Sequence, residues 1–138
     1  MSAIWTGVSV KDMTKNSYKK SFGTLGEKIA CEFLNNNRYE IIAKNFRAGR
    51  LGEIDIIARE NEYICFIEVK SRTGTLYGMP SEAIGRKKQE YIRRLASLYA
   101  ARYFTGDICM RFDVVEIIFE KVGSIKKIKE INLIKNAF

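Results

Sequence analysis

The chain has 138 residues, a length typical of a single domain, and it carries a formal net charge of +8. A basic surplus of this size on a small chain favours a polyanionic partner, most simply nucleic acid, although lysine-rich tails also serve solubility. Histidine is absent, which excludes Ser-His-Asp and Cys-His catalysis, histidine-based zinc sites and nucleases with a histidine general base.

Three widely separated cysteines, Cys31, Cys65 and Cys109, have apolar neighbours and no Cys-x-x-Cys spacing. This pattern indicates buried, reduced thiols and a cytoplasmic protein. No apolar stretch is long enough to span a bilayer, and no signal-peptide pattern occurs at the start of the sequence. We therefore expect no membrane attachment.

The first part of the chain is polar and basic, and we expect residues 1–20 to form a flexible segment before one domain that spans residues 21–138. Apolar residues at helical spacing then predict a helix over residues 25–36. Thr24 and Glu27 have the spacing of a capping box at its start. Glu27 therefore has two interpretations: it closes the capping box, or it reaches a site formed with other segments.

Three strand-like segments follow and predict an antiparallel meander. The first spans residues 40–47 and is followed by a glycine-containing turn over residues 48–52. The second and third span residues 53–59 and 63–70 and form a hairpin around a turn at Asn61-Glu62. Counting along this hairpin from its turn gives the expected register of the two strands.

This register places Asp55 opposite Glu68 and Glu53 opposite Lys70, with opposed Cβ atoms roughly 5 Å apart. Period-2 alternation puts Glu68 and Lys70 on one face of the sheet, together with Asp55. Three apolar side chains share that face: Ile57, Ile64 and Phe66.

Charged side chains in such an apolar hairpin are costly unless they are paired or bind a metal. Two opposed carboxylates repel each other, and a divalent cation between them would turn this repulsion into binding. Oxygen ligands suit Mg²⁺ or Mn²⁺. The alternative is a surface hairpin whose polar face carries an ordinary Glu–Lys pair, and the apolar side chains on the same face argue against it.

Glycines and a proline between residues 74 and 80 predict a loop, and residues 81–104 then have the pattern of a long helix with Lys88 inside its apolar stripe. Residues 108–120 and 125–134 have the pattern of two further strands. The expected fold is α/β, with the order α-β-β-β-α-β-β and helices flanking a mixed β-sheet.

Asp55, twelve intervening residues and then Glu68-Val69-Lys70 resemble the PD-(D/E)XK nuclease signature, and the expected order of elements is similar to its restriction-endonuclease-like core. That signature has Pro before the Asp, where this chain has Ile54. A wider set of motifs resembles the YraN-like family of small bacterial proteins over about residues 22–119, and the layout is similar to archaeal Holliday-junction resolvases. These motifs are Gly26-Glu27, Asn45-Phe46-Arg47, Gly52-Glu53-Ile54-Asp55, Phe66-Ile67-Glu68-Val69-Lys70-Ser71-Arg72, Gly78-Met79-Pro80, Lys88-Gln89 and Arg111-Phe112-Asp113.

The resemblance implies a role for each residue of the signature. Asp55 and Glu68 would be direct metal ligands, and Glu27 would reach the metal directly or through water. Lys70 would orient or activate the attacking water and stabilise charge that develops on the phosphate.

Lys88 and Gln89 would, by the same resemblance, contact the scissile phosphate or hold the site in place. Lys88 also has the simpler interpretation of a side chain that snorkels past its apolar neighbours. We expect phosphate contacts from three arginines, which otherwise are ordinary surface charges: Arg47, Arg50 and Arg72.

Four further residues have interpretations outside the signature. Glu53 pairs with Lys70 or faces solvent. Asp113 and Arg111 form a structural ion pair on the fourth strand. Tyr77 stacks on a base or packs within its glycine-rich loop.

Together these features predict a metal-dependent endonuclease that uses Mg²⁺ or Mn²⁺ and hydrolyses phosphodiester bonds in DNA, including branched or processed intermediates. The alternative is a nucleic-acid-binding adaptor with a nuclease-like fold and no catalysis. A homodimer is a reasonable arrangement, because cutting both strands of a duplex or junction requires two sites.

Overall fold

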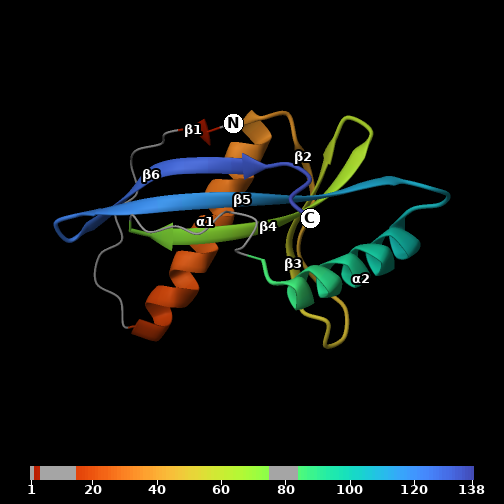
Figure 1. Ribbon diagram of the computed structural model, residues 1–138, viewed down its shortest axis with the longest axis horizontal. Helices are drawn as coiled ribbons and strands as arrows, with labels where there is room; N and C mark the ends of the chain where they lie inside the picture. The colour runs from red at the N-terminus through yellow and green to blue at the C-terminus, as the bar shows by residue number, and fades with distance from the viewer. Residues whose placement is uncertain (1, 4–14, 75–83) are drawn as a thin grey trace.

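The computed structural model describes residues 2–3, 15–74 and 84–138 (Figure 1). Two helices and six strands occur in this part of the chain. In chain order they are β1 (Ser2–Ala3), α1 (Lys15–Asn36), β2 (Glu40–Arg47), β3 (Glu53–Glu60), β4 (Tyr63–Thr73), α2 (Arg86–Tyr103), β5 (Cys109–Val122) and β6 (Ile125–Ile134).

All six strands belong to one mixed sheet with the order β1-β6-β5-β4-β3-β2. β4 and β5 are parallel, and every other neighbouring pair is antiparallel. The connection between the parallel strands contains α2, as a crossover between parallel strands requires. The predicted α/β class, the order from α1 onwards and the antiparallel meander of β2, β3 and β4 are confirmed.

The two helices cover opposite faces of the sheet. Alternate residues of β3 and β4 belong to two different apolar clusters: Ile56 and Cys65 pack in the cluster with α1, whereas Ile57 and Phe66 pack in the cluster with α2. This alternation is the period-2 pattern of a sheet that is covered on both sides. It explains why residues 56–58 of β3 and 64–67 of β4 are all apolar and why a charge next to them needs a partner.

The hairpin of β3 and β4 has the predicted turn and register, but only over part of its length. Glu60 pairs with Tyr63, and the ladder continues to Ile56 and Ile67. Asn61 in the turn has a positive φ of 53°, a conformation that asparagine tolerates better than most residues. The predicted ladder pairs Asp55–Glu68 and Glu53–Lys70 are absent from the described register, which stops one residue before Asp55.

Helix α1 begins well before the predicted position. It starts at Lys15, ten residues before the expected first residue, so Thr24 lies inside the helix. A capping residue needs non-helical backbone at a helix end, and the predicted capping box is therefore wrong. Helix α2 runs from Arg86 to Tyr103, within the range predicted for the long helix, and its Leu98 is 47% exposed although the helical pattern of apolar residues includes it.

The prediction of a flexible segment over residues 1–20 stays a prediction, because residues 4–14 lie outside the described part of the chain. Within this segment, Ser2–Ala3 pair with β6 and residues 15–20 belong to α1. No helix in the described residues is both long enough and apolar enough to cross a bilayer. The three cysteines are free, but only Cys65 is buried, and the expected burial is wrong for Cys109, which is exposed.

Candidate metal and nucleic-acid site

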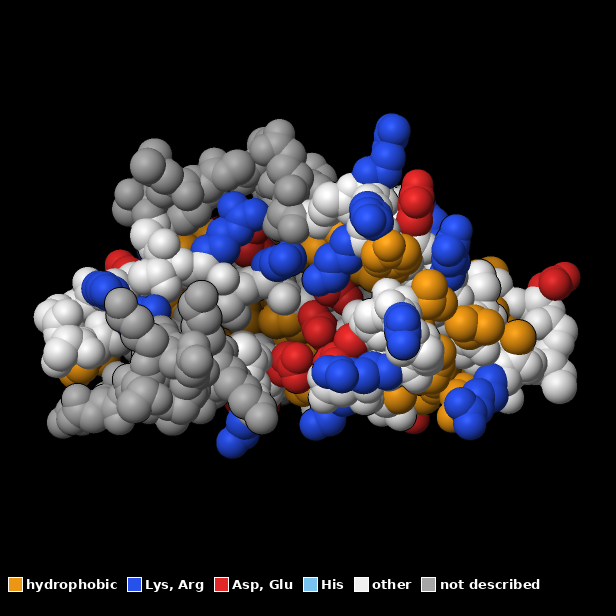
Figure 2. Space-filling view, turned by 90° about the horizontal axis from the view of Figure 1, so that it is seen from below, with side chains coloured by type: hydrophobic (Ala, Val, Ile, Leu, Met, Phe, Trp, Pro, Cys, Tyr) orange, Lys and Arg blue, Asp and Glu red, His pale blue; other side chains and the backbone are white. Residues whose placement is uncertain are grey.

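Acidic side chains from α1, β3 and β4 meet near the middle of the molecule. Figure 2 shows Asp and Glu side chains gathered near the centre of one face, with Lys and Arg side chains on both sides of them. The acids that the structure brings together are Glu27, Glu53, Asp55 and Glu68.

Three of these carboxylates form a tight group. One oxygen each from Glu27, Glu53 and Asp55 lie within 4.8 Å of one another. The sequence predicted Glu27 and Asp55 as metal ligands, whereas Glu53 was expected to pair with Lys70 or face solvent. Instead, Glu53 faces the other two acids and forms an ion pair with Arg47, so that expectation is corrected. Oxygen donors at this spacing fit a hard divalent cation such as Mg²⁺ or Mn²⁺.

Glu68 lies beside Asp55 but outside that group of three. Its side chain is only 2% exposed, and its Oε2 atom lies 3.0 Å from the Nζ atom of Lys88. Its Oε1 atom is buried and has no hydrogen-bond partner among the described residues. A buried polar atom without a partner is costly. A cation bound next to Asp55 would satisfy this oxygen of Glu68.

The backbone explains why the hairpin ladder stops at this point. Asp55 Oδ2 accepts a hydrogen bond of 2.9 Å from the backbone N–H of Val69, so a side chain replaces the expected strand partner. The alternation of β3 breaks here as well, because Ile54 packs with α2 while Ile56 packs with α1. The break gives the Asp55 side chain a different direction from the one that strict alternation predicts.

The neighbouring strand β2 is distorted at the same level. Asn45 lies between the pairs Lys44–Ile56 and Phe46–Ile54, and it has a positive φ of 55°. With its amide nitrogen toward the carboxylates, Asn45 donates to Glu27 Oε2 at 3.1 Å and to Glu53 Oε1 at 2.6 Å. One amide therefore holds two acids from different elements. The sequence indicates this role only indirectly, through the place of Asn45 in the Asn45-Phe46-Arg47 motif.

A close approach of α1 to the sheet places Glu27 at the site. A Cβ atom at Gly26 would lie 2.5 Å from the Oγ atom of Ser71 on β4, closer than a side chain normally comes. Only glycine leaves this space without a shift of its neighbour. The glycine therefore brings the following residue, Glu27, toward Asp55.

Burial and mutual repulsion shift the pKa values of the acids upward. Burial raises the pKa of Glu68 to about 7, and the charge of Asp55 adds to this shift despite the opposing charge of Lys88. Burial also raises the pKa of Asp55, although the hydrogen bond from Val69 opposes the change. Burial and the charges of Asp55 and Glu53 raise the pKa of Glu27. The group thus resists full ionisation unless positive charge is added.

Two lysines border these acids. Burial lowers the pKa of Lys70, and the charge of Lys88 lowers it further. For Lys88, burial disfavours the charged form, but the charge and hydrogen bond of Glu68 outweigh it and raise the pKa. The structure thus places Lys88 directly at Glu68, which favours a site role over simple snorkelling.

The predicted nucleic-acid contacts are dispersed around the site. The Arg47 side chain is 74% exposed and paired with Glu53, and Arg50 is exposed in the turn after β2. Arg72 lies 3.5 Å from Glu116, a buried acid that no motif of the sequence indicates. Gln89 donates to the backbone carbonyl of Ile84 at 2.9 Å, which suits a positioning role. Tyr77 lies outside the described residues.

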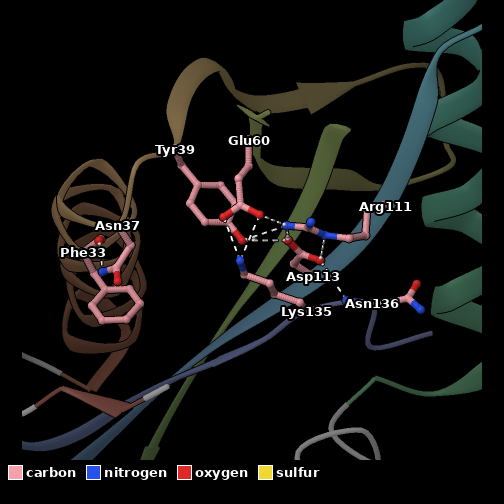
Figure 3. A network of polar contacts seen from close by, with 8 residues as sticks. All are labelled: Phe33, Asn37, Tyr39, Glu60, Arg111, Asp113, Lys135 and Asn136. Carbon is pink, nitrogen blue, oxygen red and sulfur yellow. Dashed lines mark hydrogen bonds and ion pairs between the residues drawn. The ribbon is translucent and has the colours of Figure 1, made fainter. Parts of the chain in front are cut away.

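A second polar network lies at the other end of β3 (Figure 3). Arg111 donates to Asp113 through Nε at 2.9 Å and a terminal nitrogen at 2.8 Å, and to Glu60 at 3.0 Å. Tyr39 donates to Asp113 at 3.1 Å, and Lys135 donates to both oxygens of Glu60 at 2.9 and 2.8 Å. The predicted pair of Asp113 and Arg111 is confirmed as part of this larger structural network.

The carboxylates of this network have partners throughout. Asp113 Oδ1 also accepts the backbone N–H of Asn136 at 2.9 Å, which attaches the C-terminal residues to β5. Burial raises the pKa of Glu60, but hydrogen bonds from Lys135 and Arg111 outweigh it and hold the pKa below its ordinary value. Every charge is thus compensated, in contrast to the first site.

Comparison with known proteins adds relatives that span nearly the same length. A protein of Acetivibrio thermocellus is 54% identical over 120 residues, which cover 87% of this chain and 92% of the relative. A protein of Clostridium kluyveri is 46% identical over 123 residues, covering 89% and 98%. One of Caldicellulosiruptor bescii is 46% identical over 120 residues, covering 86% and 98%. Each bears the name UPF0102 protein.

A family match covers the site itself. Residues 26–117 match the uncharacterised protein family UPF0102, and this range contains the four acids and both lysines described above. The resemblance to the YraN-like family of small bacterial proteins is thereby confirmed. The chain belongs to the protein family UPF0102.

Proposed function

We propose that this protein is a metal-dependent endonuclease that hydrolyses phosphodiester bonds in DNA in the cytoplasm, where its three free cysteines would stay reduced. The observation that carries the proposal is the meeting of Glu27, Glu53 and Asp55 within 4.8 Å, next to the buried and unpartnered oxygen of Glu68. Folding brings these acids together at an electrostatic cost, and a bound cation offsets that cost.

The donor set fits Mg²⁺ or Mn²⁺, which Asp55, Glu27 and Glu53 would hold, with Glu68 at its side. When bound, such an ion acts as a Lewis acid that favours deprotonation of water and neutralises charge on a phosphate. Carboxylates alone would repel a DNA backbone, so the acids need this ion before a phosphate can approach.

The lysines then supply what phosphodiester hydrolysis further requires. Lys70 is half-buried, so its positive charge is weakly screened and can stabilise the negative charge that develops on the phosphate. Lys88 holds Glu68 in place through their 3.0 Å contact, and its half-exposed ammonium also faces an incoming backbone. The excess of positive charge over the whole chain favours association with DNA.

The decisive experiment measures cleavage of labelled duplex, single-stranded, flapped and four-way-junction DNA and of RNA, with Mg²⁺, with Mn²⁺ and with EDTA. We expect cleavage that EDTA abolishes and Mn²⁺ restores. We expect Asp55→Ala to lose at least about 10³-fold in rate, because a metal site contributes several kcal/mol to transition-state stabilisation.

Asp107→Ala, at an exposed aspartate away from the site, is the matched control and should cleave like the wild type. Circular dichroism and urea unfolding establish that both variants fold. Wild-type cleavage by Asp55→Ala would refute the proposed site. Binding of DNA by the wild type without any cleavage would instead favour the non-catalytic adaptor.

A further inference from the structure

A cavity of about 580 Å³ lies between the turn after β2 and helix α2, directly beside the acidic site. Two residues belong to both: Glu53 is one of the three grouped acids, and Lys88 contacts Glu68. Any molecule in this cavity therefore lies against the residues that would act on a phosphodiester. Its size is within the range of ligand pockets in proteins.

The cavity has an apolar wall and a basic rim. Leu51, Ile92 and Leu95 form apolar parts of the lining, and Tyr91 adds an aromatic ring. The positively charged residues of the lining are Arg50, Lys87 and Lys88. An apolar interior with cations at its edge complements a nucleotide, whose planar base avoids water and whose phosphates are anionic.

Tyr91 is the aromatic residue of this lining. Tyr91 is partly buried on α2, and the Nζ atom of Lys87 lies 5.9 Å from the centre of its ring. A base that stacks on such a ring gains stacking energy, while the cation beside it meets the phosphate attached to the same nucleotide.

A second cavity continues the path along α2. It has a volume of about 540 Å³, shares Leu51 with the first and is lined further by Arg93, Arg94, Ser97 and Leu98. Figure 2 shows hydrophobic side chains at the surface next to the central acids, with Lys and Arg side chains among them. A strand that leaves the acidic site along α2 thus meets both apolar and positively charged side chains.

We propose that the cavity at Tyr91 binds an unpaired base of the substrate, next to the phosphodiester at the acidic site. This inference rests on the proposed function and names its substrate class: DNA with a single-stranded segment, rather than fully paired duplex. In a duplex the bases are stacked on one another and paired, so occupation of the cavity would cost unstacking that an unpaired nucleotide avoids.

The test measures binding with Ca²⁺ in place of Mg²⁺, so that a divalent cation compensates the acids while hydrolysis is suppressed. Fluorescence anisotropy compares a labelled oligothymidylate with a blunt duplex of equal length, for the wild type, Tyr91→Leu and Tyr91→Phe. Tyr103→Leu is the matched control, because Tyr103 is an exposed tyrosine of the same helix outside both cavities. Thermal unfolding establishes that each variant folds.

We expect Tyr91→Leu to weaken single-strand binding about 5- to 100-fold, the range of a lost base–aromatic stack, and to change duplex binding less than twofold. Tyr91→Phe keeps the ring and should restore single-strand binding, and Tyr103→Leu should match the wild type. An equal loss on both DNAs, or no loss on the single strand, overturns this inference and leaves the endonuclease proposal standing. Failure of the wild type to bind either DNA overturns both.

Discussion

The two ends of β3 carry acids in opposite electrostatic states. At the C-terminal end of β3, Glu60 meets Arg111 and Lys135, and hydrogen bonds from these cations hold the pKa of Glu60 below the ordinary value. At its start, Asp55 and Glu53 face another carboxylate, and the pKa of Asp55 is raised. The same sheet thus contains one network that satisfies its own charges and one that does not.

This difference distinguishes a structural network from a candidate ligand site. A paired network such as that of Arg111 stabilises the fold whether or not a ligand is present. An acid group without enough cations lowers stability in the free protein, and such groups are retained where a ligand supplies the missing charge. Each of the following four tests substitutes a residue of one of these two sites and uses the other site as the reference. They are ordered from the largest expected effect to the smallest.

Arg111→Met should have the largest effect on stability. The substitution keeps a similar volume but leaves Asp113, which is fully buried, without its cation. Removal of one partner from a buried ion pair costs about 3–5 kcal/mol in the free energy of unfolding. Urea unfolding at neutral pH measures this loss. A loss below about 1 kcal/mol would contradict the structural role of the network.

The acidic site should respond to pH in the opposite direction from the paired network. The pKa of Glu68 in the folded protein is about 7, above its ordinary value of 4.5, so the folded state binds more protons than the unfolded state between these pH values. The free energy of unfolding of the metal-free protein should therefore rise by roughly 2 kcal/mol as the pH falls from 8 to 5.5.

Glu68→Gln removes the titrating group and should make this rise clearly smaller. Glu60→Gln is the control: because the pKa of Glu60 is lowered, its contribution is present above pH 4.5 and is lost only below it. Urea unfolding of all three proteins in EDTA at both pH values gives the comparison. An unchanged rise in Glu68→Gln would show that Glu68 is not a proton-binding group in this range.

Asn45→Gly tests the amide that holds two of the acids. Glycine adopts the positive φ of Asn45 without strain, so the substitution removes the two hydrogen bonds and keeps the backbone. Loss of a residue that orients ligands weakens metal binding by about 10- to 100-fold, which calorimetric titration with Mn²⁺ would measure.

Asn136→Gly provides a matched control at the paired network. Asn136 has a φ of 54°, nearly the same as Asn45, and contacts Asp113 only through its backbone N–H in the described bonds. Its substitution should leave Mn²⁺ affinity unchanged. Equal Mn²⁺ affinity in Asn45→Gly and the wild type would exclude the positioning role of Asn45.

Arg47→Met should have the smallest effect on stability, within about 0.5 kcal/mol, because its ion pair with Glu53 is exposed to solvent. The identical substitution at Arg111 gives the reference. If Arg47 contacts a phosphate, the variant should bind duplex DNA more weakly and reduce the salt dependence of binding by about one counterion. A loss in the free energy of unfolding as large as that of Arg111→Met would mean that solvent exposure does not explain the difference between the ion pairs of Arg47 and Arg111.

The signature residues were accessible from the sequence because they lie close together in it. Asp55, Glu68 and Lys70 belong to one hairpin, and the turn at Asn61-Glu62 sets which positions lie near one another. Counting along the ladder nevertheless gave wrong strand partners for Asp55 and Glu53, because it assumes a regular backbone. The hydrogen bond from Val69 to the Asp55 side chain breaks that regularity, and no periodicity in the sequence reports it.

Other contacts join residues that lie far apart in the sequence, so counting along one hairpin does not reveal them. Glu60 and Arg111 are 51 residues apart, and Tyr39 and Asp113 are 74 apart, so no local pattern indicates either pair. Glu27 and Asn45 likewise come from α1 and β2, and their meeting depends on how closely the helix approaches the sheet at Gly26.

The sequence by itself determined the strands β2 and β6, the hairpin turn, the order of helices and strands from α1 onwards and the identity of the hairpin acids, since these depend on short-range periodicity and turn chemistry. Tertiary structure decided that Glu53 joins Glu27 and Asp55, that Glu68 keeps one oxygen without a partner, and that Lys88 rather than Lys70 contacts it. The physical reason is that charge pairing depends on distances of a few ångströms between elements, and packing of the whole chain sets those distances.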